Sequence, residues 1–387
     1  MSHFTPNADI IKPIMALTFY RKYRPKTLAD LVGQEEISEV IRNAAKADRL
    51  AHAYLFYGPR GTGKTTTARI LAKIANCETR TNDKKFHDLG EPCNHCRPCL
   101  EIDSGHALDV VEIDAASNRG IDEMRSLKEG IKLSPTSYRY KVYIIDEAHQ
   151  LTKEAANALL KTLEEPPEHA IFILATTEYD KLPATIVSRT QRFNFHKASL
   201  KMLVEELQKI SEAEKIKTEK PALELIASSA EGSFRDAEAL LEQVYSFEKE
   251  ITLKGVESVL GKVGLSKTSS LSKQLLEGDL AGALKFVEEM DESGANMVQM
   301  TKDLIQYLRR VLALSFDPNI ISIFERELTE EELKEMQEQA KLIKLEKHVP
   351  LIKSLIEAYS NMRYSPFPIV PVEVAIVENL GKENSKS

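Results

Sequence analysis

The sequence lacks several features that specialised proteins need. Its 387 residues include no Trp and only four Cys, and no apolar run approaches the roughly 18 residues of a membrane span. The N-terminus has neither the basic start nor the apolar run and small-residue cleavage site of a secretory signal. We therefore expect a cytoplasmic protein with no membrane segment, whose cysteines lie in a reducing compartment.

The sequence also lacks a basic excess. Its formal net charge is −7, which argues against a stand-alone nucleic-acid binder but leaves room for a local basic face or for DNA binding shared with other subunits. With 42% hydrophobic residues, the chain has enough apolar material for two or three domains. Residues 1–16 form a weakly patterned leader and residues 381–387 a polar tail.

Short apolar runs alternate with helical patterns from residue 17 to residue 197. Expected strands are 53–57, 110–113, 141–145 and 170–175, and expected helices include 65–76 and 154–163. This alternation predicts a parallel sheet covered by helices on both faces. After residue 197 strand patterns stop. Helical spacing follows over 200–213, 221–229, 234–247 and, with breaks near 316–318 and 364–371, over 265–380.

The most specific motif lies between the first expected strand and the helix that follows. It fits G-x-x-x-x-G-K-[ST] and comprises Gly58, Pro59, Arg60, Gly61, Thr62, Gly63, Lys64 and Thr65, followed by Thr66. Glycines let backbone N–H groups turn toward phosphate oxygens, and the helix directs its N-terminal dipole at the same anion. We expect Lys64 to reach the β- and γ-phosphates of ATP, and the Thr65 hydroxyl to hold Mg²⁺.

Two carboxylates end another expected strand. Asp146 is expected to hold Mg²⁺ through its shell, and Glu147 to polarise the attacking water; alternatively both merely cap the next helix. The tetrapeptide from Asp146 to His149 also spells a helicase signature, which is weak by itself.

Polar groups further along the chain are candidates for sensing or stabilising the phosphates. Thr176 and Thr177 directly follow the strand 170–175, so a hydroxyl there could lie near the γ-phosphate or could simply cap the strand. Arg189 could act as an arginine finger, in its own subunit or a neighbour, or could be a solvated surface residue.

The four cysteines fall close together as Cys77, Cys93, Cys96 and Cys99. Four thiolates suit a tetrahedral, structural Zn²⁺. The polar segment that holds them has little hydrophobic core of its own, so a bound metal would stabilise its fold. An iron–sulfur cluster is the rival interpretation, although the fourth Cys of ferredoxin runs is missing. His95 and His106 are alternative ligands.

Taken together, these motifs resemble the gamma/tau subunit family of the bacterial DNA polymerase III clamp loader. The resemblance covers residues 17–380. It rests on the phosphate loop, the cysteines, Asp146 and Glu147, and on these further segments: 23–34 (YRPKTLADLVGQ), 112–117 (EIDAAS), 159–167 (LLKTLEEPP), 175–177 (ATT), 188–189 (SR), 231–236 (EGSFRD) and 364–368 (YSPFP). Thr190 departs from the Cys that is common in the family.

The resemblance implies an α/β AAA+ P-loop ATPase domain with a parallel sheet, followed by an all-α lid domain and an all-α collar domain. The expected boundaries are 17–197 for the ATPase domain with a zinc-binding insertion at 77–99, 198–262 for the lid, and 263–380 for the collar that oligomerises.

The resemblance also implies an ATPase that is a component of the DNA polymerase III holoenzyme. It would load the sliding clamp onto primed DNA during replication, together with delta and delta-prime subunits and further copies of itself. Thr177 would sense the γ-phosphate, Arg235 would act from the lid as a second sensor, and Arg189 would act in trans on a neighbour's ATP. Alternatives are a nucleotide-binding but nonhydrolysing structural subunit, another AAA+ DNA-remodelling ATPase, and a zinc-finger DNA reader.

Overall fold

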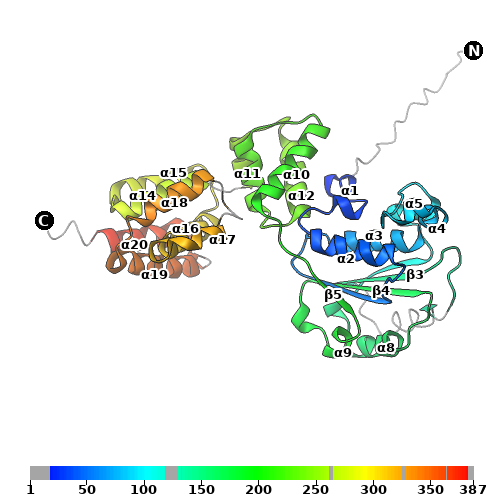
Figure 1. Ribbon diagram of the computed structural model, residues 1–387. Helices are drawn as coiled ribbons and strands as arrows, with labels where there is room; N and C mark the ends of the chain where they lie inside the picture. Colours follow the sequence, from blue (N-terminus) through cyan, green and yellow to red (C-terminus); the bar gives the residue numbers. More distant parts are fainter. Residues whose placement is uncertain are drawn as a thin grey trace, which may run out of the picture.

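The computed structural model describes residues 18–117, 130–131, 133–260, 265–324, 328, 330–362 and 364–381. The chain forms three bodies in a row: an α/β body, a small helical body and a C-terminal helical body (Figure 1). In the described part of the chain, every helix is too short or too polar to cross a membrane. The leader and most of the tail lie outside the described residues, as do Asn118 and Arg119, which in the sequence are candidates for DNA phosphate contacts or for solvated surface.

The first body is built on a five-stranded parallel sheet. Its strands are β1 (Ala53–Tyr57), β2 (Val110–Asp114), β3 (Lys141–Asp146), β4 (Ala170–Thr176) and β5 (Gln191–Asn194), in the order β2-β3-β4-β1-β5. The first four confirm the predicted strands. The fifth was missed, because Phe193 is the only buried residue in a segment that is otherwise exposed.

Helices cover both faces of this sheet (Figure 1). On one face lie α2 (Glu35–Lys46), α3 (Lys64–Asn76) and α6 (Arg97–Ser104), and on the other α8 (Lys153–Glu164) and α9 (Ala184–Val187). Ile70, Leu71 and Ile74 of α3 are fully buried against the sheet. Two cores, one on each face, therefore hold the carboxyl ends of β1, β3 and β4 in fixed positions.

The second body contains α10 (Leu200–Ala213), α11 (Lys220–Ser229), α12 (Phe234–Phe247) and α13 (Leu253–Leu260). It is not purely helical, because β6 (Lys217–Thr218) pairs in parallel with β7 (Glu250–Ile251). Strands of two residues are too short to produce a periodic hydrophobic pattern in the sequence.

The N-terminal helix α1 (Phe19–Lys22) packs on this second body. Phe19 is buried in the same apolar cluster as the helices of that body, and its backbone N–H donates to Glu242 at 3.0 Å. Lys22 and the Tyr23 hydroxyl both donate to Glu214. The expected ATPase domain begins at residue 17, yet this helix contributes to the core of its neighbour.

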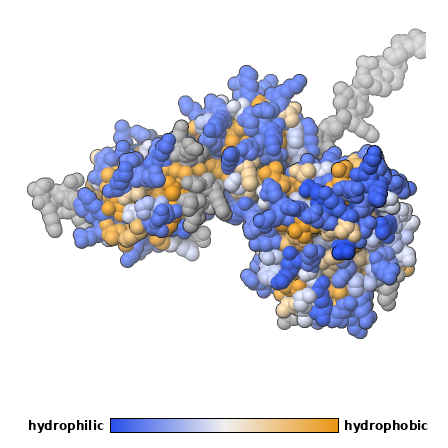
Figure 2. Space-filling model, in the orientation of Figure 1, coloured by the Kyte–Doolittle hydropathy of each residue, from blue (hydrophilic) through white to orange (hydrophobic). Residues whose placement is uncertain are grey.

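The third body is helical throughout its described residues. Its helices are α14 (Leu265–Glu277), α15 (Leu280–Glu292), α16 (Met297–Phe316), α17 (Ile321–Phe324), α18 (Glu330–Ala340), α19 (Leu345–Met362) and α20 (Ile369–Leu380). The ends of α16 and α19 confirm the two predicted breaks. Figure 2 shows hydrophobic residues on the surface of this body. Val370, Val374 and Val377 of α20 are exposed, and their helical spacing places them on one face.

Candidate nucleotide and metal sites

The glycine-rich loop joins β1 to α3, as the motif predicts. Gly58, Gly61 and Gly63 all have positive φ angles, of 138°, 72° and 101°. Space is also tight: a Cβ atom on Gly58 would lie 2.3 Å from the Phe195 carbonyl oxygen, and one on Gly61 would lie 1.8 Å from Ser233 Oγ. Glycine is thus required at both positions by backbone angle and by close contact.

Lys64 and Thr65 start α3 at the mouth of this loop. The buried Lys64 ammonium donates to the carbonyl oxygens of Gly58 and Pro59 at 2.8 and 2.6 Å. Burial lowers the pKa of Lys64, and the charges of Glu147 and Asp146 act in the opposite direction. Thr65 Oγ1 donates to Asp146 Oδ2 at 2.7 Å, so two proposed magnesium ligands from separate elements already touch.

Glu147 lies just past the end of β3, in a left-handed backbone conformation with φ of 48°. Such a conformation is costly for a residue other than Gly and recurs at functional sites. Its carboxylate accepts a hydrogen bond from Thr177 Oγ1 at 3.1 Å, and His149 Nδ1 lies 3.4 Å from it. His149, which sequence reasoning set aside with the helicase signature, also lies 2.9 Å from Thr176 Oγ1.

These groups face one cavity between the first and second bodies. Its lining includes the loop from Arg60 to Thr66, the acidic pair Asp146 and Glu147, and Thr177. The second body adds the start of α12, whose Phe234 N–H donates to the Gly61 carbonyl at 3.1 Å. Arg235 follows directly, with its guanidinium 5.0 Å from the centre of the Tyr20 ring. Gly58 and Pro59 are not lining residues but hold Lys64.

Arg189 lies elsewhere. It follows α9 and borders a separate hollow together with His52, Leu163 and Glu164. Its guanidinium forms an ion pair with Glu164 and donates to the Thr185 carbonyl oxygen at 2.8 Å. The described structure therefore brings together all the predicted nucleotide-site residues of this chain except the proposed finger.

Sequence reasoning missed the wall of the cavity that faces the loop. This wall consists of Tyr20, Tyr23, Arg24, Pro25, Asp30, Leu31, Val32, Glu206, Phe234 and Glu238. Six of its residues, Tyr23 to Pro25 and Asp30 to Val32, fall in the segment YRPKTLADLVGQ that carried the resemblance, but no spacing rule links that segment to the phosphate loop.

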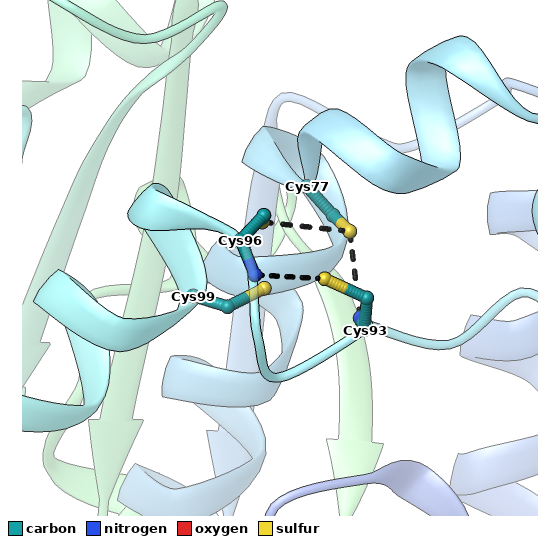
Figure 3. Close-up of side chains that lie close together, drawn as sticks. All are labelled: Cys77, Cys93, Cys96 and Cys99. Atoms are coloured by element: carbon teal, nitrogen blue, oxygen red, sulfur yellow. Dashed lines mark hydrogen bonds between the residues drawn. The ribbon is translucent and has the colours of Figure 1, made fainter.

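The four cysteines meet beside α3. Their Sγ atoms all lie within 4.8 Å of one another, and the side chains face a common point (Figure 3). Sulfurs around a tetrahedral Zn²⁺ with bonds of about 2.3 Å would lie about 3.8 Å apart, so the arrangement fits such an ion with small adjustments. His95 and His106 are exposed and bond to other groups, Cys93 O and Ser104 Oγ respectively.

Backbone N–H groups point at these sulfurs, as thiolate ligands require. Cys77 Sγ accepts from Arg80 and Cys93 at 3.5 and 3.4 Å, and Cys93 Sγ accepts from Cys96 at 3.2 Å. A hydrogen bond with the Cys99 thiol, reinforced by these N–H groups, lowers the pKa of Cys77, and the same bond raises the pKa of Cys99.

A buried lysine ties this cluster to the phosphate-loop helix. Lys73 of α3 is 1% exposed, and its ammonium lies 2.8 Å from both Asn94 Oδ1 and Asp103 Oδ1. It also donates to the Lys26 carbonyl at 2.9 Å. Because Asn94 lies in the loop between two of the cysteines, the cluster and α3 share one polar anchor.

Comparison with known proteins gives consistent matches along the chain. Residues 33–199 match the family described as DNA polymerase III, delta subunit, and residues 202–248 the DNA polymerase III clamp loader subunit, ATPase lid domain. Residues 251–381 match DNA polymerase III subunits gamma and tau domain III. The chain is 35% identical over 358 residues to DNA polymerase III subunit gamma of Buchnera aphidicola subsp. Acyrthosiphon pisum, covering 92% of this chain and 96% of that protein.

The chain belongs to the DNA polymerase III gamma/tau family.

This gamma/tau chain is also 42% identical over 361 residues to DNA polymerase III subunit tau of Bacillus subtilis, across 93% of its own length and 62% of that relative. The parallel sheet, the lid and the helical third body confirm the predicted AAA+ architecture, a fold that supports the use of nucleotide and Mg²⁺. A solved structure of Thermotoga maritima RuvB, a Holliday junction branch migration motor, has a TM-score of 0.46 and 22% identity, over 66% of this chain and 80% of that one.

Proposed function

We propose that this gamma/tau chain is an ATP-driven motor subunit of the bacterial replicative clamp loader, which places the sliding clamp on primed DNA. The observation that carries the proposal is the cavity in which Lys64, Thr65, Asp146, Glu147 and Arg235 meet, while Arg189 lies outside it. Because the cavity contains groups for phosphate, metal and water but not the arginine finger, we infer that a neighbouring subunit supplies that arginine.

In this proposal each residue has a distinct role. Lys64 binds the β- and γ-phosphates, Thr65 and Asp146 hold Mg²⁺, and Glu147 orients the attacking water. The bound Mg²⁺ would neutralise charge that develops on the transferred phosphoryl group. Thr177 senses the γ-phosphate through the same hydroxyl that now donates to Glu147.

The lid and the neighbouring subunit complete the site. Arg235 reaches the phosphates from α12, because the start of that helix already bonds to the loop at Gly61. Arg189 of a neighbouring copy supplies charge to the transition state. The partners are delta and delta-prime subunits, further copies of this chain, the sliding clamp and primed DNA, in the cytoplasm.

The rival function is a nucleotide-binding structural subunit that does not hydrolyse ATP. The polar contacts around Glu147 favour a motor, because an adaptor has no need of a carboxylate held by Thr177 in a costly backbone conformation.

We expect slow ATP turnover from the isolated chain and at least tenfold faster turnover when delta-type subunits, the clamp and primed DNA are present. The reason is that the finger is supplied by a neighbour. Release of phosphate is measured with and without these partners. Equal rates under both conditions would contradict a site that a neighbour completes, and no hydrolysis under either would favour the adaptor.

We further propose that Cys77, Cys93, Cys96 and Cys99 hold one structural Zn²⁺. With four thiolate ligands the ion would have no open position for chemistry. Its contribution would be to fold the segment 77–99, whose helices α4 (Glu78–Asn82) and α5 (Lys84–His87) have no buried apolar side chain of their own.

Elemental analysis of freshly purified protein should find one zinc per chain. Removing it with a chelator should lower the melting temperature by about 5–10 °C, since loss of a few kcal/mol shifts a domain of this size by several degrees. In a Cys96→Ser variant the chelator should cause a much smaller shift, because the ion is already lost or weakly held. Iron in the fresh protein, or no metal at all, would overturn this assignment.

A further inference from the structure

One buried acid in the nucleotide cavity has no role in the proposed mechanism. Glu238 of α12 lines the cavity and is 7% exposed. Among the described residues, burial and the charges of Glu206 and Arg24 act on its carboxyl group, and no hydrogen bond does. Its oxygens are not among the fully buried, unpartnered side-chain atoms of the described residues, so they are accessible from the cavity, where a bound ligand would complete their hydrogen bonding.

The direction of α12 places Glu238 away from the phosphate end of the cavity. The helix touches the phosphate loop at its first residue, through Phe234 N–H and Gly61 O. Arg235 is next, and Glu238 lies a further three residues along, about 4.5 Å farther down the helix axis. The same cavity is lined by the flat or apolar side chains of Tyr20, Tyr23, Leu31 and Val32. Such a lining, in a cavity that extends beyond the phosphate loop, suits a purine base.

Charged and titratable groups from each surrounding element line the same cavity as Glu238. Glu206 comes from α10, Arg24 and the two tyrosines from the N-terminal segment, Asp30 from the short helix η1 (Leu28–Asp30), and Arg235 from α12 itself. Glu206 is paired with Lys209 on its own helix at 3.4 Å. Burial raises the pKa of Glu238 to about 8; the charge of Glu206 adds to this effect and that of Arg24 opposes it.

At neutral pH Glu238 is therefore mostly a neutral carboxyl group, with one O–H donor and one carbonyl acceptor. The edge of adenine presents a matching pair, because N1 accepts and the N6 amino group donates. An ionised carboxylate offers two acceptors and cannot donate to N1. The edge of guanine presents two N–H donors, which suit the ionised form.

We propose that Glu238 is a specificity-determining residue that reads the adenine base of ATP, donating from its carboxyl O–H to N1 and accepting from the N6 amino group. This inference rests on the proposed binding of ATP in the same cavity. It adds a residue that distinguishes bases to a site whose other groups bind phosphate and metal.

The test measures the affinity of the full chain for ATP, dATP and GTP between pH 6 and pH 9. In the wild type, ATP and dATP should bind with constant affinity up to about pH 7 and should weaken by up to about tenfold by pH 9, as the protonated fraction falls. The affinity for GTP should not fall in parallel. Glu238→Gln keeps a donor and an acceptor but cannot ionise, so its profile for ATP should be flat relative to the wild type.

Two further variants sharpen the test. Glu206→Gln removes a negative charge that raises the pKa of Glu238, so the loss of ATP affinity should begin at a lower pH. Glu205→Gln makes the same chemical change at the next position, which is exposed, and its profile should match the wild type. Melting temperatures check that each variant is folded.

Several results would overturn the inference. One is a pH profile of ATP affinity in Glu238→Gln that is the same as in the wild type. Another is a parallel fall in the affinities for ATP and GTP. A third is a pH profile for dATP that differs from that for ATP, which would indicate that the carboxyl group binds the ribose. Each leaves ATP bound through the phosphate loop. Failure of every variant and the wild type to bind ATP at any pH would instead remove the proposed function itself.

Discussion

Replacing Lys64 with alanine should weaken ATP binding by about 100-fold or more. The ammonium makes two hydrogen bonds within the loop and would exchange them for bonds to phosphate oxygens. Charge-assisted hydrogen bonds contribute roughly 1.5–3 kcal/mol each, so losing two removes at least about two orders of magnitude in affinity. Titration calorimetry or a fluorescent ATP analogue would measure the change.

The fold should survive this substitution. Burial lowers the pKa of Lys64, which means that the folded protein holds the charged form at a cost. The melting temperature of Lys64→Ala in the absence of nucleotide should therefore stay within a few degrees of the wild type. Lys46→Ala, which changes an exposed lysine at the end of α2, is the matched control and should bind ATP normally. Unchanged affinity in Lys64→Ala would refute the phosphate-loop assignment.

Replacing Arg189 with alanine should reduce turnover in the assembled loader by about 10³-fold, the scale on which arginine fingers act. ATP affinity of the isolated chain should not change, because Arg189 lies outside the cavity that contains the loop. Arg192→Ala is the matched control: this arginine is exposed and, among the described residues, its guanidinium bonds only to the Tyr179 hydroxyl, at 3.4 Å. We expect this control to retain most of its activity.

Mixing two inactive variants tests whether the finger acts in trans. In an assembly that contains both Arg189→Ala and Lys64→Ala chains, an Arg189→Ala chain can bind ATP while a Lys64→Ala neighbour supplies the finger. Partial recovery of turnover is the expected result. If the mixture is as inactive as either variant alone while the control pair of wild type and Lys64→Ala is active, Arg189 does not act on a neighbour's ATP.

Features whose residues lie close together in the chain could be predicted from the sequence alone. The loop from Gly58 to Thr65, the buried strand before it and the helix after it lie together in the chain, so one motif predicts both structure and chemistry. The cysteine cluster was similarly accessible, because its ligands span only residues 77–99. The strand that ends at Asp146 was found from its continuous apolar run.

Features that depend on distant contacts were not predictable in the same way. β5 pairs with β1 along its whole length, but Phe193 is its only buried residue, so the segment gives no periodic pattern. Glu238 looks like any helical surface residue until α12 is placed against the phosphate loop. The position of Arg189 outside its own site follows from the packing of α8 and α9, and only the resemblance to a known family suggested the consequence.

The packing of α1 has a practical consequence for protein engineering. Phe19 is 8% exposed because it fills a space among the helices of the second body, more than 180 residues away in the chain. A boundary chosen from the ATPase motifs alone could fall after this helix. Such a truncated protein would keep an intact sheet but would expose an apolar face on the lid. Its loss of stability and solubility would therefore originate in the lid, far along the chain from the truncated end.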